Sequence, residues 1–158
     1  MYWIDIAAPG RLAIAPAPPS GDGLALTVRT WRAAGVDQVI SLLETDEALS
    51  LALQSEHRLC AAEGLRFDNV PIVDHGVPRS ADAFRPLVAS CSADLTAGRS
   101  LLVHCWAGIG RSSLLAACVM TALGLEPREA FRRISAARGL VTPETRAQRA
   151  WVLDFARG

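Results

Sequence analysis

The sequence of 158 residues contains no lysine, so arginine supplies all 16 of its basic side chains, against 16 aspartate and glutamate side chains. The formal net charge is therefore zero. A balanced charge gives no sign of the positive surface that binding to nucleic acid or to anionic membranes requires. We expect neither nucleic acid nor a membrane among the partners of this chain.

Long apolar runs are also missing, because no stretch approaches the length that spans a bilayer. The first residues lack the basic and apolar regions of a signal peptide. The four cysteines, at positions 60, 91, 105 and 118, are spaced too irregularly for a zinc site or a disulfide framework. We therefore expect a cytoplasmic monomer with reduced thiols and a single domain over residues 1–158.

The most informative stretch of the chain covers residues 103–113. An apolar run at residues 100–104 predicts a strand that is buried on both faces. From Ser112 onward the residues are apolar nearly all round, which predicts a central core helix that ends near Gly124. A short loop joins the buried strand to the buried helix.

This loop has the properties of an anion site. The first N–H groups of a helix have no intrahelical partner, and the positive end of the helix dipole points the same way. The glycines of the loop allow a turn with inward amides, and Arg111 adds a planar cation that binds two phosphate oxygens. The expected phosphate-binding loop consists of Trp106, Ala107, Gly108, Ile109, Gly110 and Arg111.

Cys105 begins this loop and is the candidate nucleophile. The loop amides, the helix dipole and Arg111 all favour its thiolate over its thiol. Ser112 is placed to hydrogen-bond the sulfur, and His104 is expected to order the loop by hydrogen bonding. The alternative is a buried structural cysteine, the usual fate of an isolated free thiol.

The sequence His104-Cys105-x-x-Gly108-x-x-Arg111-Ser112 resembles the signature of protein tyrosine and dual-specificity phosphatases. The rest of the chain is similar to the compact dual-specificity class, in particular the cyclin-dependent-kinase-associated type. The resemblance implies an α/β fold, with a central, mostly parallel twisted sheet of about four or five strands flanked by helices. It also implies a cysteinyl-phosphate mechanism that needs no metal and no organic cofactor.

Hydrophobic periodicity and turn residues predict the remaining elements. Strands are expected at residues 2–6, 11–15, 36–43 and 66–73. Helices are expected at residues 24–34, 46–62, 80–97 and 126–138, with a last helix that begins at the Thr142 cap.

Asp74 is the candidate general acid. It follows the strand at 66–73, and Asp-x-x-x-Pro resembles the acid loop of the small phosphatases. An acid on a mobile loop can protonate the leaving oxygen and later activate water. The alternatives are an Asx-turn role for Asp74, with Asp82 as the acid, and a second proton carrier at His75. Glu44 either touches the site or caps the helix that follows it.

Gln148 lies on the apolar stripe of the last helix, and a polar group there must find a partner. Pro-Glu-Thr-x-x-Gln resembles the C-terminal glutamine segment of related phosphatases, which implies a role in placing the attacking water. An equally acceptable interpretation puts Gln148 at the exposed edge of the stripe.

The expected substrate is a phosphorylated protein or a small phosphomonoester, most of all phosphotyrosine. Alternatives are an inositol-phosphate phosphatase and a catalytically weak module that binds phosphoproteins. The lipid-directed relatives carry lysines in the loop, whereas this loop has Trp106, Ala107 and Ile109 at those positions. The order of residues around Cys105 also argues against a sulfurtransferase or an arsenate reductase.

Overall fold

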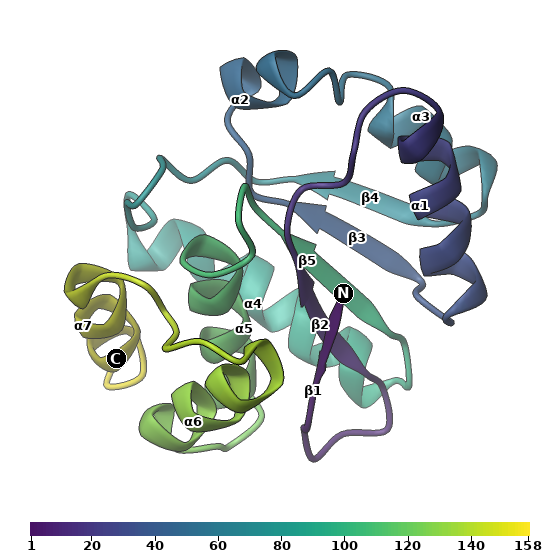
Figure 1. Ribbon diagram of the computed structural model, residues 1–158. Helices are drawn as coiled ribbons and strands as arrows, with labels where there is room; N and C mark the ends of the chain where they lie inside the picture. The colour runs from purple at the N-terminus through teal and green to yellow at the C-terminus, as the bar shows by residue number, and fades with distance from the viewer.

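The computed structural model describes residues 1–158, and its centre is a five-stranded sheet with helices on both faces (Figure 1). The strand order is β1-β2-β5-β3-β4, and every neighbouring pair is parallel except β1 and β2. The strands are β1 (Tyr2–Ile4), β2 (Leu12–Ala15), β3 (Gln38–Ser41), β4 (Arg66–Asn69) and β5 (Leu101–His104). The expected α/β class with a mostly parallel sheet is confirmed.

The chain has seven helices, six of which cover the sheet in two layers, while the second of them lies beyond its carboxyl edge (Figure 1). They are α1 (Asp22–Ala33), α2 (Thr45–Ser50), α3 (Glu56–Ala62), α4 (Ala81–Thr96), α5 (Arg111–Ala122), α6 (Pro127–Arg138) and α7 (Arg146–Phe155). Helices α1 and α3 lie on one face, and α4 to α7 lie on the other. None of these helices combines the length and the apolar character that crossing a bilayer would take.

Strand β5 lies at the middle of the sheet because its side chains are apolar on both faces. Leu101 and Val103 enter the larger core cluster, with residues of α4, α5 and α7, whereas Leu102 enters the smaller cluster beneath α1. This alternation follows from the two-residue period of a strand. Helix α5 packs at the centre of the larger cluster and is buried from Arg111 to Met120, as its apolar sequence predicts.

The parallel strands bring three chain segments to one edge. Strand β5 runs into the loop before α5, β3 runs into α2, and β4 runs into the segment that leads to α4. After β4 the backbone still follows β3, since the N–H of Val70 donates to the oxygen of Ser41 and that of Ile72 to Leu42. The carboxyl ends of strands in open α/β sheets are where ligands bind.

The expected single helix at 46–62 is wrong. The chain forms α2, then turns, and then forms α3. Ala52 has a left-handed φ of 53°, and the turn lets the N–H of Leu53 donate to the oxygen of Ala48 while its side chain enters the core. Leu49, which a continuous helix over 46–62 would turn inward with Leu53, is 59% exposed. Neither glycine nor proline marks this break, so periodicity alone extended the helix across it.

The last helix also begins later than expected. Its N-cap is Thr145, in a capping box with Gln148, and not Thr142. Thr142 is buried instead, and its N–H donates to the Oγ of Ser135 on α6. Thr145 caps the helix because it has a glutamine three residues later, which is the capping-box spacing.

The turn at Ala52 yields a test of the corrected helix boundary. Glycine adopts a left-handed φ without the steric cost that alanine incurs, so Ala52→Gly should raise the free energy of unfolding by up to about 1 kcal/mol. The control Ala89→Gly, on the exposed face within α4, should lower it by about 1 kcal/mol. Urea denaturation measures both. A loss of stability in Ala52→Gly equal to that of the control would restore the continuous helix.

Candidate active site

A cavity of about 510 Å³ opens at the carboxyl edge of the sheet. Side chains and backbone from four segments far apart in the sequence line it. They are Glu44, Glu47, Asp74, His75, Cys105, Trp106, Ala107, Gly110, Arg111, Glu144 and Gln148. The expected Cys105, Arg111, Asp74 and Gln148 are thus brought together. The other expected site residues that do not line the cavity are His104, Gly108, Ile109 and Ser112.

The loop between β5 and α5 has a row of free backbone donors. None of the N–H groups from Trp106 to Ser113 donates a hydrogen bond within the protein. The last of them belong to the first turn of α5, where an intrahelical partner is impossible. Unpaired amides at the start of a twelve-residue helix, on the floor of a cavity, favour an anion.

Gly108 fixes the path of the loop against the end of β2. It has a φ of 67°, and an added Cβ would lie 2.5 Å from the carbonyl carbon of Ala15 and 2.6 Å from the nitrogen of Pro16. The N–H of Ala17 donates to the oxygen of Trp106 at 3.0 Å, which closes the same contact. Only glycine fits here, because both the backbone angle and the space exclude a side chain.

Arg138, at the end of α6, holds the carbonyl side of the loop. Its Nε donates to the oxygen of Gly108 at 3.1 Å, and its Nη2 to the oxygen of Ala107 at 3.2 Å. The guanidinium also lies over the ring of Tyr2, 4.5 Å from the ring centroid. Carbonyls that are bound from outside leave the N–H groups of the same peptides free for the cavity.

Arg111 is a buried cation, only 2% exposed. Its Nη1 and Nη2 donate to the two carboxylate oxygens of Glu47 at 2.6 and 2.8 Å, and Nη1 also donates to the oxygen of Ile72 at 2.9 Å. Burial opposes the charge, but the hydrogen bonds to Glu47 and the negative charges of Cys105, Glu47 and Asp74 together outweigh it and raise the pKa of Arg111. Burial likewise opposes ionisation of Glu47, and yet the hydrogen bonds from Arg111 and from the Glu44 N–H lower its pKa.

Glu47 is a residue of the candidate site that the sequence analysis missed. The signal was Glu-x-x-Glu directly after a strand, which is a possible capping pair at the carboxyl edge of the sheet. The structure places Glu44 as the N-cap of α2 in a capping box with Glu47, and also in the lining of the cavity. Both interpretations of Glu44 therefore apply.

Cys105 lies on the cavity floor, with its Sγ 3.5 Å from the Oγ of Ser112. His104 is fully buried, and its ring nitrogens make no hydrogen bond to the loop. Its Nε2 lies 3.1 Å from the Oε1 of buried Glu56. The hydrogen bonds to the loop come from Arg138 and from Ala17.

The other cysteines are buried away from the cavity. Burial raises the pKa of Cys60 and of Cys91 to about 12, and it also raises the pKa of Cys118. Thiols with raised pKa values are poor nucleophiles at neutral pH. Cys105 is the one cysteine that lines the cavity.

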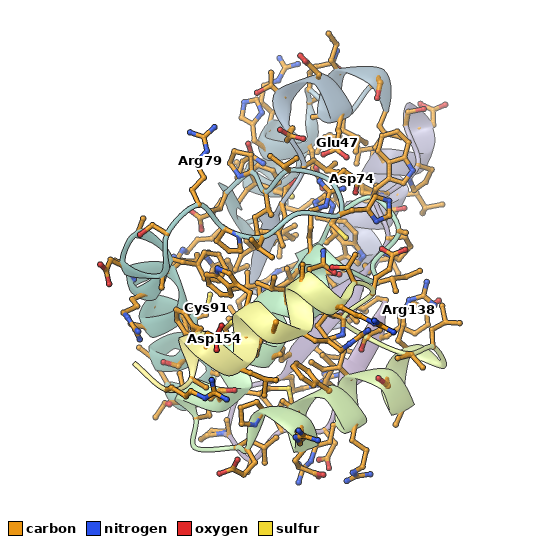
Figure 2. All side chains as sticks on the ribbon, turned by 90° about the vertical axis from the view of Figure 1, so that its left-hand side faces the viewer. Glu47, Asp74, Arg79, Cys91, Arg138 and Asp154 are labelled. Atoms are coloured by element: carbon orange, nitrogen blue, oxygen red, sulfur yellow. The ribbon has the colours of Figure 1, made fainter.

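Asp74 lies beside Arg111, with 2.9 Å between its Oδ1 and the Nη2 of Arg111. Figure 2 shows Asp74 and Glu47 close together, while Arg79 extends away from them. Asp82, the rival acid, is 98% exposed on α4 and does not line the cavity. The placement of Asp74 therefore fits an acid that acts in the cavity better than that of Asp82 does.

Gln148 joins the loop of Asp74 to the phosphate loop. It is fully buried, its Oε1 accepts from the N–H of Thr145 at 3.1 Å, and its Nε2 donates to the oxygen of Gly76 at 3.1 Å. An added Cβ on Gly110 would lie 2.9 Å from that Nε2. The structure thus places Gln148 at the cavity and not at the exposed edge of its helix.

Known proteins with similar sequences are phosphatases. A family model described as the Swiss Army Knife protein, DSP-PTPase phosphatase domain, matches residues 3–152. Tyrosine-protein phosphatase vhp-1 of Caenorhabditis elegans is 24% identical over 131 residues, which cover 79% of this chain and 20% of vhp-1. This chain thus spans about a fifth of the length of that relative.

Solved structures share the fold. Kinase associated phosphatase, solved with its catalytic-site cysteine replaced by serine, aligns with a TM-score of 0.89 and 19% identity over 99% of this chain and 93% of its own. Tk-PTP in its active form aligns with a TM-score of 0.76 and 25% identity, covering 99% and 97%. PTPMT1 in complex with PI(5)P aligns with a TM-score of 0.72 and 20% identity, covering 92% and 90%.

The ion pair between Glu47 and Arg111 predicts a pH-dependent stability. Because the folded pKa of Glu47 lies below its unfolded value, the pair stabilises the fold above the unfolded pKa and is lost as the pH falls through the folded one. Glu47→Gln should therefore lose about 1–3 kcal/mol at pH 7, and the loss should shrink as the pH falls below about 4.5. Urea denaturation from pH 7 to pH 3 measures this difference. A loss that stays constant over this range, or that appears equally in exposed Glu126→Gln, would contradict it.

The contact of Arg138 with the loop predicts a role in anion affinity. Arg138→Met removes both donors and keeps much of the aliphatic stem, so inorganic phosphate should bind about tenfold more weakly. Arg128→Met, exposed on the same helix, is the matched control and should bind phosphate normally. Isothermal titration calorimetry measures both variants. Equal phosphate affinity in the two would mean that Arg138 does not shape the loop.

Proposed function

This chain belongs to the family of DSP-PTPase phosphatase domains, and from that premise we propose that it is a cysteine-dependent phosphatase that hydrolyses phosphomonoesters, phosphotyrosine above all, without a metal. The observation that carries the proposal is one cavity that holds the Cys105 thiol, a row of unpaired amides and the Arg111–Asp74 pair. The buried-structural alternative for Cys105 fits this placement poorly, because a structural thiol needs neither free donors nor a cavity.

Binding comes first in the proposed mechanism. The loop amides and Arg111 hold the phosphoryl oxygens and offset the charge that spreads over them in the transition state. The Asp74 carboxylate lies beside the Nη2 of Arg111. A phosphoryl oxygen competes for that nitrogen, so substrate binding releases the Asp74 carboxyl for proton transfer.

Two chemical steps follow. The Cys105 thiolate attacks phosphorus, and the bond from phosphorus to the ester oxygen breaks. The departing oxygen keeps the electron pair of that bond and accepts a proton from Asp74. Asp74, now a carboxylate, then accepts a proton from water as that water attacks phosphorus. The phosphorus–sulfur bond breaks, and the hydroxyl of Ser112 donates to the returning thiolate from 3.5 Å.

Gln148 supports the second step in this proposal. Its amide lines the cavity and donates to the backbone of the loop that carries Asp74. An amide group offers both a donor and an acceptor, which suits a water molecule that must be oriented before attack. Its capping bond to Thr145 limits its freedom, so the water is placed by a fixed group.

A comparison of substrates with different leaving groups tests whether Asp74 is the general acid. The phenol of tyrosine has a pKa of about 10, so its departure needs a proton, whereas nitrophenol is far more acidic and leaves without one. Asp74→Asn should lower kcat for a phosphotyrosine peptide about 100-fold or more, and kcat for nitrophenyl phosphate only a few-fold. Phosphate release, assayed with a chelator present, measures both.

The matched control for this test is Cys105→Ser, which should nearly abolish turnover of both substrates and leave the fold intact. Equal losses on the two substrates in Asp74→Asn would remove Asp74 as the acid. Undiminished release by Cys105→Ser, or complete loss of wild-type activity in chelator, would overturn the proposed function.

A further inference from the structure

More carboxylates line the mouth of the cavity than the proposed mechanism requires. Four carboxylates line it, from Glu44, Glu47, Asp74 and Glu144, and Arg111 is the only arginine among the lining residues. Glu47 balances Arg111, and Asp74 serves as the acid. Glu44 and Glu144 remain as carboxylates that a site for a phosphate dianion would be expected to avoid.

Of these two residues, Glu144 has the more exposed side chain. Its Oε2 lies 3.1 Å from the position that a Cβ on Gly110 would occupy, so the carboxylate stands directly beside the phosphate loop. The side chain is 43% exposed, and the imidazole of His75 lies beside it, with 3.4 Å between Nδ1 and Oε2. Arg149 donates to the backbone oxygen of Glu144 and leaves the carboxylate free.

Trp106 is a second observation that bears on which substrate groups bind at the mouth of the cavity. Its side chain is 46% exposed, whereas every other tryptophan, tyrosine and phenylalanine is buried or half-buried, and it lines the same cavity. The face of a tryptophan ring attracts lysine and arginine side chains when carboxylates are close by. A cationic group on the substrate would therefore find both an aromatic face and an unbalanced carboxylate.

We propose that this site selects phosphotyrosine flanked by basic residues, with Glu144 as the specificity-determining side chain. The inference rests on the proposed function and names its substrate class. A neighbouring arginine on the substrate offsets the repulsion between Glu144 and the phosphate dianion, whereas a neighbouring glutamate adds to it. Multiply phosphorylated inositols bring further negative charge to the same mouth and are disfavoured for the same reason.

Three phosphotyrosine peptides of equal length test this selection. They differ only in the two residues on each side of the phosphotyrosine, which are arginine, alanine or glutamate. The kcat/KM of the wild-type chain should be highest for the arginine peptide and at least about tenfold lower for the glutamate peptide. The preference should shrink in high salt, because exposed charges are screened.

Glu144→Gln should narrow the range of kcat/KM among the peptides, chiefly by raising it for the glutamate peptide. The matched control is Glu126→Gln, which removes the same charge from the exposed start of α6, outside the cavity. This control should keep the full wild-type preference. Binding of the same peptides to Cys105→Ser, measured by fluorescence anisotropy, ranks them without turnover.

The two measurements separate this inference from the proposed function. A wild-type chain that binds the arginine peptide best but releases no phosphate would overturn the proposed activity and leave the charge selection standing. Peptides that bind and react equally would overturn the selection while the activity stands. An inositol trisphosphate cleaved faster than the arginine peptide, or an unchanged preference in Glu144→Gln, would also overturn the selection.

Discussion

A buried arginine whose charge must be balanced organises the site. The Arg111 guanidinium is nearly inaccessible to water, so it needs partners from the protein or from a ligand. The segment after β3 supplies Glu47, and the segment after β4 supplies the oxygen of Ile72 and the carboxylate of Asp74. The parallel order of β5, β3 and β4 is what brings these segments to one place.

The same parallel order explains why much of the site was predictable from the sequence. The loop from Cys105 to Arg111 is local, because the strand before it and the helix after it fix its shape. Asp74 was predictable as a polar residue just beyond a strand, at the edge where ligands bind. The α/β class was implied by the resemblance of the loop sequence to the dual-specificity phosphatases, and the apolar run before Cys105 agreed with a buried parallel strand.

Contacts between segments far apart in the chain could not be predicted from the sequence. Glu47 meets Arg111 from 64 positions away, and only the pairing of β3 with β5 reveals that contact. The break at Ala52 carries no glycine or proline, since the turn is imposed by the burial of Leu53. Gln148 stayed ambiguous because a glutamine beside an apolar stripe suits an exposed edge as well as a cavity, and only the placement of α7 decides between them.

The shared fold leaves the choice of substrate to the rim of the cavity. Kinase associated phosphatase and PTPMT1 have the fold of this chain at 19% and 20% identity, yet the first is named for its association with a kinase and the second was solved with PI(5)P bound. A fold therefore positions the thiol and the anion loop without selecting what carries the phosphate. In the substrate selection that we propose, this choice falls to the side chains around the loop, where Glu44, Glu144 and Trp106 line the cavity.

A crystal structure with orthovanadate tests the central claim most directly. Vanadate adopts the geometry of the phosphoryl group in transfer, and the account predicts vanadium bound to the Sγ of Cys105. Its oxygens should lie within hydrogen-bond distance, about 2.7–3.1 Å, of the amides from Trp106 to Arg111 and of the Arg111 guanidinium. Vanadate bound elsewhere, with Cys105 unmodified and those amides facing away from the cavity, would contradict the account.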